Sequence, residues 1–445
     1  MTDSCSSVSP AWSPAWSPAR LVSCVPSLEK RASWTISVAA SLLFVVVPQV
    51  HAETHSVGVG DDIQAVIDGA ASGDRIEFSA GDYPGMSLDL GDKTLDLVGA
   101  VAPDGTPQTR LIGTSAAPIV SVLGSETAGL RLENLELRSG GGGVRFEGQT
   151  LLLTNCNFNN QNNTFAVDST FERLTAIPDI DVIDCRFDGN GSGVISCLGG
   201  SLRIHNSDFT NNHPRQGIIV RAHSCNEMIV TDSRFTDNTF SALSASSCEL
   251  VRISGSNFTR NGGQQRWTTG GAVALSQNRD VRVASCQFEG NFAANGGALS
   301  SSFPDSRTET HFLPLFGPND PVTPDAYQPL VIEDCAFSGN NATATGGGLY
   351  LHDHWADVMV RRTAFIGNGS AVHGGGIHCG LMSQFRITLE DCEVTSNTAP
   401  MGGGVSGVSP PWSFQYSSPI RPAAIRLVDT RICGNSGGQV DSVVV

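Results

Sequence analysis

The sequence predicts an all-β fold, a single right-handed parallel β-helix that carries a short N-terminal capping helix. Three observations predict it. One motif recurs from about residue 128 to the end of the chain, its copies keep a constant internal spacing, and each copy alternates apolar with polar residues. The composition agrees, because 49 glycines and only 16% charged residues are typical of a turn-rich β chain. A solenoid can extend over 445 residues as one unit.

Residues 1–52 are predicted to be a leader, or signal peptide. Lys30 and Arg31 precede an apolar run at 36–47 that is too short to span a bilayer, and the small-x-small sequence VHA at 50–52 predicts cleavage near Ala52. The mature chain is therefore expected to be exported to the extracellular space, the periplasm or the outer-membrane surface. The leader is unusually long, which leaves two alternatives: a start codon downstream of the first Met, or a membrane-anchored N-terminus.

Residues 53–75 are expected to cap the first rung, and residues 76–440 to form the β-helix itself. Asp61 or Asp62 can begin a short helix, since either carboxylate can accept hydrogen bonds from the first backbone N–H groups. Three apolar residues lie on one face of that helix: Ile63, Val66 and Ile67. Such a helix covers the open end of the solenoid and prevents it from pairing with another sheet edge.

Each copy of the repeat is centred on one large apolar residue, which we call the anchor. The anchors are Leu135, Phe158, Phe187, Phe209, Phe235, Phe258, Phe288, Phe337, Phe365, Val394 and Ile432. Apolar residues stand seven and five positions before almost every anchor, and an asparagine stands three positions after nine of them. This alternation is that of a β-strand, whose alternate side chains share one face.

Copies with a constant register stack naturally if each of them forms one coil of a parallel β-helix. An antiparallel sandwich would instead require every copy to pair with neighbours of different orientation. Leucine-rich and ankyrin-type solenoids do not fit, because no helical period occurs inside the repeat. Stacking places phenylalanine on phenylalanine in the core and asparagine on asparagine at a turn, about 4.8 Å apart.

Two sequence patterns resemble known families. FTRN at 258–261 with GGAV at 270–273, and FEGN at 288–291 with GGAL at 296–299, match the FxxN and GGA[ILV] repeat pair of chlamydial-type polymorphic outer membrane proteins. The stretch DDIQAVIDGAASGDRIEF at 61–78 is similar to the opening of secreted pectate-lyase-like β-helix proteins. These resemblances imply the fold, but this superfold hosts adhesins, lyases, hydrolases and epimerases alike.

Ten cysteines lie in the mature chain, and five of them stand two residues before an anchor: Cys156, Cys185, Cys286, Cys335 and Cys392. Other copies carry Ser or Thr there, so the position requires a small side chain. Cysteines that share a position on neighbouring rungs have the separation that a disulfide needs. Two alternatives stay open. One is a set of disulfides, Cys156–Cys185, Cys225–Cys248 and Cys286–Cys335, and the other is a ladder of free, packed thiols.

Two insertions interrupt the repeat, at 301–328 and 409–423. Both leave the coil just after a Gly-Gly strand, where other copies carry shorter loops, so the loops are expected to form one rim along one edge. The candidate substrate-binding residues of this rim are Tyr350, Trp355, Phe385, Trp412 and Tyr416. The adjoining strands should present one column of outward residues: Ala274, Ser300, Tyr350, His378 and Ser406. Alternatively, the insertions only pack against the wall of the solenoid.

Candidates for catalysis accompany the rim. His352, His354 and His378 could approach one another as an acid–base site, and Arg215 and Arg221 could neutralise a uronate carboxylate. Solvated histidines and surface arginines explain the same residues equally well. The motifs expected of polygalacturonase-like hydrolases and of Asp-Pro-His-Glu epimerases do not occur. We expect no metal site and no cofactor, and a Ca²⁺ ion is not indicated.

The formal net charge is −16 and the sequence has no basic patch, so we expect no nucleic acid partner. We also expect no transmembrane helix in the mature chain. The leading hypothesis is an exported protein that binds polysaccharide or cell-surface glycans, in the manner of an adhesin, with no assignable catalytic motif. One alternative is a polysaccharide lyase or glycoside hydrolase that acts on acidic polysaccharide at the rim. A second alternative is a purely structural surface protein.

Overall fold

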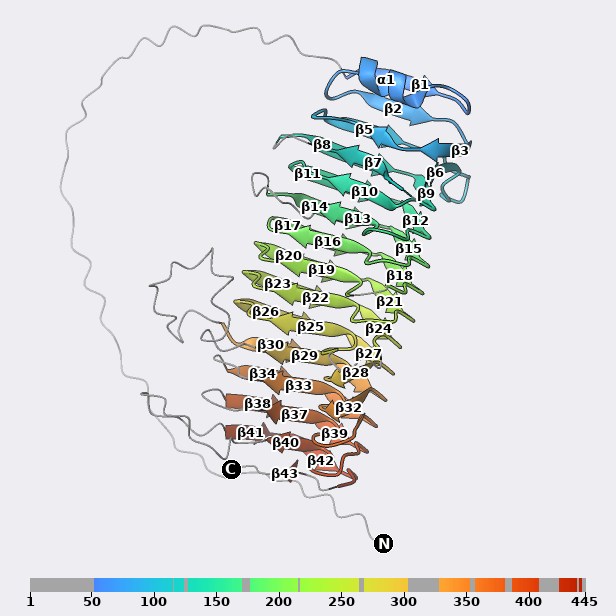
Figure 1. The fold of residues 1–445 in the computed structure, drawn as a ribbon. Coiled ribbons are helices and arrows are strands. Elements are labelled where there is room, and N and C mark those ends of the chain that lie inside the picture. Colours follow the sequence, from blue (N-terminus) through green and yellow to red (C-terminus); the bar gives the residue numbers. More distant parts are fainter. Residues whose placement is uncertain are drawn as a thin grey trace, which may run out of the picture. The chain divides into compact units, whose positions relative to one another are not determined.

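The computed structural model describes residues 52–114, 116–123, 127–169, 177–214, 217–263, 268–302, 328–352, 357–380, 386–407, 424–437 and 440–441. Within these ranges, strands stack rung upon rung in parallel, from the blue end that carries the helix α1 (Ile63–Gly69) to the red end (Figure 1). The fold is the right-handed parallel β-helix that the repeat predicts. Among the described residues, no helix has the length and apolar character needed to cross a membrane.

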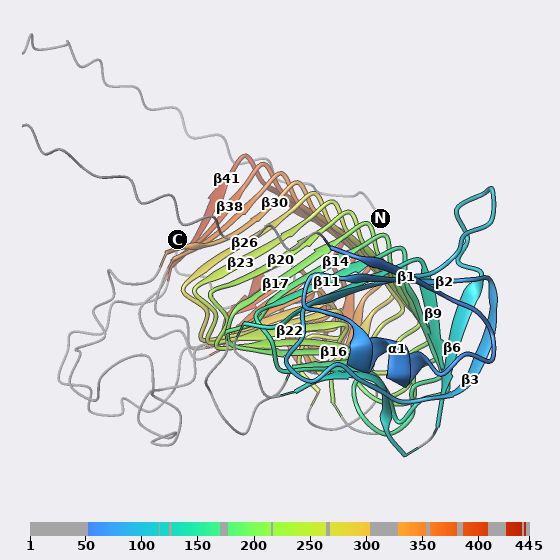
Figure 2. The same cartoon turned by 90° about the horizontal axis from the view of Figure 1, so that it is seen from above.

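Three parallel sheets form the walls of the solenoid, as the view along its axis shows (Figure 2). Sheet A contains β1 (Thr54–Val57), β2 (Arg75–Phe78), β5 (Leu95–Val98), β8 (Gly129–Glu133), β11 (Thr150–Thr154), β14 (Asp179–Ile183), β17 (Ser201–His205), β20 (Glu227–Thr231), β23 (Leu250–Ser254), β26 (Asp280–Ala284), β30 (Leu330–Glu333), β34 (Val358–Arg361), β38 (Arg386–Glu390) and β41 (Ala424–Val428).

Sheet B follows sheet A in each rung. It contains β3 (Gly81–Met86), β6 (Thr109–Gly113), β9 (Leu135–Arg138), β12 (Asn157–Asn159), β15 (Arg186–Asp188), β18 (Asp208–Thr210), β21 (Arg234–Thr236), β24 (Asn257–Thr259), β27 (Gln287–Glu289), β31 (Ala336–Ser338), β35 (Ala364–Ile366), β39 (Glu393–Thr395) and β42 (Arg431–Cys433).

Sheet C completes the rung. It contains β4 (Leu88–Asp89), β7 (Pro118–Val122), β10 (Gly142–Phe146), β13 (Val167–Ser169), β16 (Ile195–Leu198), β19 (Val220–His223), β22 (Leu243–Ser246), β25 (Val273–Ser276), β29 (Leu299–Ser302), β33 (Leu349–His352), β37 (Ile377–Gly380), β40 (Val405–Gly407) and β43 (Val440–Asp441). A short fourth sheet contains β28 (Phe292–Asn295), β32 (Asn341–Thr345) and β36 (Gly369–Ser370).

The anchors form a column of stacked rings in the core, inside sheet B. From Phe158 to Phe365, each ring lies nearly parallel to the next, with centroids 4.5–5.0 Å apart and interplanar angles of 6–11°. The first predicted anchor, Leu135, was wrong by two residues, because Leu137 is the residue that pairs with Phe158. Both leucines are fully buried, so a two-residue shift keeps the same strand face and the sequence pattern did not distinguish them.

A ladder of buried asparagines joins consecutive rungs just after sheet B. Asn291 is typical: its Nδ2 donates to Phe258 O and to Asn340 Oδ1, both at 2.9 Å. Its Oδ1 accepts from Asn261 N at 2.9 Å and from Asn261 Nδ2 at 3.1 Å. The other members are Asn190, Asn212, Asn238, Asn261, Asn340, Asn368, Asn397 and Asn435, and Gln161 occupies the position on the rung of Phe158. The ladder satisfies backbone groups that the turn leaves without strand partners.

A second ladder runs along the corner between sheets A and B, at the small-residue position two before each anchor. Each side chain accepts from the backbone N–H of the preceding rung, as Ser207 Oγ does from Cys185 N at 3.1 Å. Each also donates to the carbonyl two residues earlier, as Cys185 Sγ does to Ile183 O at 3.2 Å. The position therefore requires a short side chain that both donates and accepts, which explains why Cys, Ser and Thr alternate there. All ten cysteines of the described chain are free thiols.

The N-terminal helix is present as expected and lies over the first rung. Asp62 is its N-cap, and Asp62 Oδ1 accepts from Ala65 N at 3.1 Å. Ile63 and Ile67 are buried against the core, with Val66 partly buried beside them. Lys93 Nζ donates to Ile67 O at 2.7 Å and to Asp68 O at 2.8 Å, so a cation from the next rung satisfies the last carbonyls of the helix.

Replacing one ladder asparagine tests the account of how the rungs are held together. In Asn291→Ala, the N–H of Asn261 and the carbonyl of Phe258 lose their partners in a fully buried site. We expect the free energy of unfolding to fall by about 3 kcal/mol, because each buried group left without a partner costs about 1–3 kcal/mol. Urea unfolding followed by circular dichroism measures this. The control is Asn257→Ala on the exposed face of β24, which should change the midpoint little. Equal losses of unfolding free energy in the two variants would contradict the account.

Candidate functional site

The outer face of sheet C is the part of the solenoid from which the predicted rim would rise. Four consecutive strands of this sheet, β29, β33, β37 and β40, are each followed directly by a segment outside the described residues. These segments are 303–327, 353–356, 381–385 and 408–423. The described part of the chain therefore stops at equivalent points on four neighbouring rungs, in keeping with the constant register of the repeat.

Six predicted site residues lie in segments outside the described residues: Arg215, His354, Trp355, Phe385, Trp412 and Tyr416. The predicted insertion at 301–328 begins too early, because Ser301 and Ser302 belong to β29 and Ser301 is buried there. It also ends too late, because Gln328 N already donates to Arg279 O of the preceding rung at 3.0 Å.

The predicted column of outward residues on sheet C is confirmed. Consecutive members of the column pair in register across β25, β29, β33, β37 and β40. The pairs are Ala274 with Ser300, Ser300 with Tyr350, Tyr350 with His378, and His378 with Ser406. Side chains that are far apart in the sequence thus become direct neighbours along the solenoid axis.

Tyr350 and His378 form the centre of a ring cluster on this column. The His378 ring lies parallel to the Tyr350 ring, with centroids 5.7 Å apart and an interplanar angle of 2°. The His373 ring stacks on His378 at 5.4 Å, and His378 Nδ1 lies 2.6 Å from Ser406 Oγ. The His352 ring lies 5.8 Å from that of Tyr350. His373, which precedes the Gly-Gly turn, was not among the predicted site residues.

Gly380 marks the point where three of these rings converge. A Cβ atom placed on Gly380 would lie 3.4 Å from His352 Cδ2, 3.4 Å from His378 Nε2 and 3.6 Å from Tyr350 Cε2. Glycine therefore keeps open the space between the two imidazoles and the phenol ring. Of the three predicted histidines, the structure brings His352 and His378 to the same glycine.

His378 is held in its neutral form at physiological pH. Its side chain is only 4% exposed although it lies on the outer face of the sheet. Burial lowers the pKa of His378 to about 4, and the neighbouring His373 and His352 add to the decrease. A neutral imidazole has one N–H donor and one acceptor nitrogen, so it can exchange hydrogen bonds with hydroxyl groups such as that of Ser406.

Arg221 lies in the same column but far from this cluster. It pairs with Ser244 and is separated from His378 by the rungs of Ser244, Ala274, Ser300 and Tyr350. Five rung spacings correspond to about 24 Å, so the structure does not bring Arg221 and His378 to one reacting centre. Arg221 has His223 beside it on β19, where burial and then the charge of Arg221 lower the pKa of His223.

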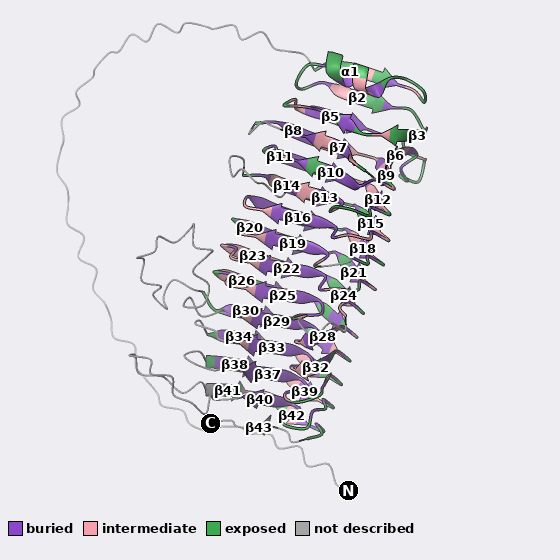
Figure 3. Ribbon diagram, in the orientation of Figure 1, coloured by how far each residue is buried: buried purple, intermediate pink, exposed green. Residues whose placement is uncertain are grey.

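Hydroxyl and imidazole groups dominate the outward positions of the described strands from β16 to β40. These positions are Ser196, Leu198, Arg221, His223, Ser244, Ser246, Ala274, Ser276, Ser300, Ser302, Tyr350, His352, His378, Gly380 and Ser406. Figure 3 shows that the strands of sheet C consist mostly of buried residues. Seven of the fifteen are serines, although serine is not a favoured strand residue. Sequence that departs from local preference is expected at functional surfaces.

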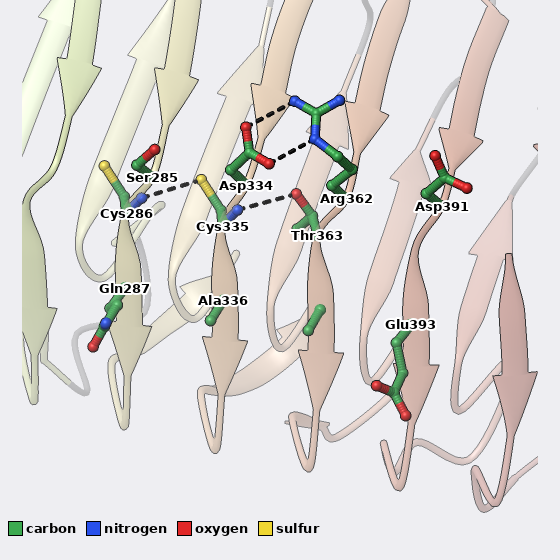
Figure 4. A pocket seen from close by; sticks show the side chains of 11 residues that line it. Ser285, Cys286, Gln287, Asp334, Cys335, Ala336, Arg362, Thr363, Asp391 and Glu393 are labelled. Atoms are coloured by element: carbon green, nitrogen blue, oxygen red, sulfur yellow. Dashed lines mark hydrogen bonds and ion pairs between the residues drawn. The ribbon is translucent and has the colours of Figure 1, made fainter.

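A hollow lies on another side of the solenoid, at the corner between sheets A and B (Figure 4). Its volume is about 560 Å³. Two consecutive rungs carry alanine at the outward position of sheet B, Ala336 and Ala364, between Gln287 and Glu393 on the flanking rungs. Two short side chains between longer ones leave the hollow. Sequence reasoning missed it because both alanines fit the strand pattern.

Charge pairs cover one side of this hollow. Arg362 Nε and Nη2 donate to the two carboxylate oxygens of Asp334 at 2.6 and 2.7 Å, and Nη2 also reaches Glu333 Oε2 at 3.2 Å. The guanidinium lowers the pKa of Asp334 below its ordinary value. Because Arg362 is already paired, the hollow presents a neutralised wall rather than a free cation. Among the described residues, no group of three or more His, Cys, Asp or Glu side chains could hold a metal ion.

Comparisons with known proteins agree on the fold. Residues 119–288 match the family model described as a right handed beta helix region. A search of curated proteins found no match to the chain.

Solved structures similar to the chain include the catalytic domain of a GH87 alpha-1,3-glucanase in complex with tetrasaccharides, at 9% identity and a TM-score of 0.40. The same kind of domain in complex with nigerose gives 10% identity and a TM-score of 0.36. Both matches cover 85% of this chain and 68% of the other. A tailspike protein of bacteriophage CBA120 gives 8% identity and a TM-score of 0.20, over 82% of this chain and 56% of the other. Similarity at this level does not bear on activity.

The buried histidine makes stability depend on pH. As the pH falls from about 6.5 towards 4, the unfolded chain protonates residue 378 before the folded chain does, so stability is lost across this window. The shift of His378 corresponds to a loss on the order of 3 kcal/mol. We expect urea midpoints to fall between pH 6.5 and 4, and His378→Gln to flatten this dependence.

The matched control for this pH dependence is His205→Gln. His205 makes the same cross-rung contact, with Nδ1 2.8 Å from Thr231 Oγ1, but on the exposed face of sheet A. Its replacement should leave the pH dependence of the midpoint as it is in the wild type. A wild-type midpoint that stays constant from pH 6.5 to 4 would contradict the assignment of a buried neutral His378.

Proposed function

We propose that the protein is exported and binds glycans on the outer face of sheet C, beside Tyr350 and His378, as a cell-surface or extracellular adhesion-type protein. The observation that carries the proposal is the ring cluster in register with a column of hydroxyl side chains. The fold supplies the rigid wall, and the function is argued from the groups on that wall.

The chemistry of the cluster suits a sugar. A pyranose has apolar C–H faces and a perimeter of hydroxyl groups, so it is bound by an aromatic ring together with short polar donors and acceptors. Tyr350, which is half-buried, supplies the aromatic ring, and the buried Ser300, His378 and Ser406 place hydrogen-bonding groups of both kinds in the wall around it.

The direction of the column favours a polymer over a single sugar. Equivalent positions recur about every 4.8 Å along the axis, and hydroxyls continue without interruption from Ser246 through Ser276 to Ser302 in the neighbouring outward column. Successive units of an extended polysaccharide would meet the same kinds of groups on successive rungs. Binding residues commonly lie on loops of a rigid scaffold, and the sequence predicts such loops after β29, β33, β37 and β40.

A second candidate function, a polysaccharide lyase or glycoside hydrolase at the same place, is favoured by one observation. The contact of 2.6 Å between His378 Nδ1 and Ser406 Oγ is close enough for proton transfer, and His352 adjoins it across Gly380. Incubation of the protein with uronate-containing and neutral polysaccharides, followed by assays for unsaturated products and reducing ends, distinguishes the two functions. Turnover that is abolished in His378→Gln would favour the enzyme.

Replacing the tyrosine ring tests the proposed binding site. Against an immobilised panel of neutral and uronate-containing polysaccharides, we expect the wild type to bind at least one, and Tyr350→Ala to weaken that binding about tenfold. A stacked aromatic ring contributes about 0.5–1.5 kcal/mol, and 1.4 kcal/mol is a factor of ten. The control is Ile366→Ala, which removes an exposed apolar side chain from sheet B and should leave binding unchanged. Equal affinities of wild type and Tyr350→Ala would refute the site.

The proposed export has its own test. Expression of the full chain in a host with a general secretory pathway should give a processed protein outside the cytoplasm, whose first residue by N-terminal sequencing is close to Glu53. Replacing Ala52 with a bulky residue such as Trp should block processing, because signal peptidase requires a small residue there. Recovery of only the unprocessed chain from the cytoplasm would overturn the export proposal but would leave the binding experiment unaffected.

A further inference from the structure

Eight of the ten free cysteines of the described chain, all but Cys379 and Cys433, fall into two groups that differ in what their sulfur atoms contact. Those two residues before an anchor bond to the backbone of their own corner ladder, as Cys185 Sγ does with Cys156 N and Ile183 O. Cys197, Cys225 and Cys248 lie elsewhere, in β16 and just after β19 and β22. They come from three successive rungs, at the corner where sheet C leads into sheet A.

Two of these sulfur atoms are in direct contact. Cys225 Sγ lies 3.8 Å from Cys197 Sγ, and each residue is 1% exposed. The other contacts of Cys225 Sγ are carbonyls, with Gly199 O the nearest at 3.2 Å. A thiol is a weak hydrogen-bond donor, so these contacts hold the pair only loosely in its reduced form.

We propose that Cys197 and Cys225 are a modification site, at which an intramolecular disulfide joins two neighbouring rungs. The two S–H bonds are replaced by one S–S bond, and a small-molecule disulfide such as oxidised glutathione accepts the two electrons and two protons to become two thiols. Cys197 pairs in register with Ala222 and not with Cys225, so this bond would run diagonally across the corner, and the observation that supports it is the sulfur contact of 3.8 Å. The pairing differs from Cys225–Cys248, the one expected from sequence position alone.

Cys248 is the competing partner, because it also lies beside Cys225, whose thiol raises the pKa of Cys248. Its Sγ is directed to backbone carbonyls, Ser246 O at 3.5 Å and Ala222 O at 3.8 Å. Cys248 N is in turn occupied by Asn278 Oδ1 at 3.0 Å, so residues 248 and 278 begin a short polar ladder of their own. The contact that selects the pairing is therefore the one between Cys225 Sγ and Cys197 Sγ at 3.8 Å.

Because the two thiols are buried in the folded protein, the bond should form before the solenoid is complete. Contact with Cys197, together with burial, raises the pKa of Cys225 well above its ordinary value. Thiol–disulfide exchange requires a thiolate and access to the oxidant, so the finished solenoid should react slowly. We therefore expect the bond to form while these rungs are closing during folding. The bond would close a loop of the chain between residues 197 and 225, beneath the part of sheet C that carries Arg221 and His223.

Refolding of the full chain tests the proposal. The reduced, denatured protein is refolded with oxidised and reduced glutathione, its remaining thiols are alkylated in denaturant, and tryptic peptides are analysed by mass spectrometry. The three cysteines fall in three different peptides, residues 187–203, 222–234 and 235–252, so the pairing is read directly. We expect a linked species of 187–203 with 222–234, two hydrogen masses lighter than the sum of the two peptides and split by a reducing agent.

Three variants make the result decisive. Cys225→Ala should abolish the linked species, and Cys248→Ala and Cys379→Ala should retain it, Cys379 being a buried cysteine elsewhere in sheet C. The oxidised wild type should also unfold at a temperature several degrees above the reduced protein, a difference that Cys225→Ala removes. A link between 222–234 and 235–252, or alkylation of all three thiols in protein that has regained its β-sheet circular dichroism, would overturn the proposal.

Discussion

The structure depends on one constraint, the constant register in which every coil stacks on the one before it. The ladder of asparagines enforces this register, since each amide bonds to the backbone of one neighbouring rung and to the amide of the other. An asparagine displaced by one residue along the strand would leave buried N–H and carbonyl groups without partners. The column of phenylalanine rings obeys the same register, and its centroid spacing of 4.5–5.0 Å matches the rung spacing.

This constraint separates the residues that form the fold from those available for function. The anchors, the ladder asparagines and the small corner residues are buried, so they form the fold, and the outward positions are those left to contact a ligand. Outward positions of sheet C form a column because the register is constant, and this is why Tyr350, His378 and Ser406 become neighbours although about 28 residues separate each from the next along the chain. The candidate site is thus a product of the repeat, although none of its residues belongs to the repeat motif.

The sequence predicted the features that follow from the repeat period. It missed those that depend on how deeply a side chain is buried between its neighbours on other rungs. The β-helix, the N-terminal helix and the outward column followed from spacing alone. The first anchor was misplaced from Leu137 to Leu135 because a shift of two residues keeps the strand face. The burial of His378, its stacking on His373 and the hollow over Ala336 and Ala364 depend on which neighbours are short or long across rungs, and linear spacing does not contain that information. The contact of Cys225 with Cys197 joins two different repeat positions, so alignment of the copies did not indicate it.

The most direct test of the central claim is a distance across several rungs at one repeat position. Spin labels on cysteines introduced at Arg234 and Glu393, with Cys5 and Cys24 replaced by alanine, would lie in one column of sheet B. Five rung spacings separate these residues. The account predicts a narrow distribution of distances by pulsed electron paramagnetic resonance, centred at about 24 Å apart from the reach of the labels. A broad distribution, or one centred well beyond about 40 Å, would contradict constant-register stacking.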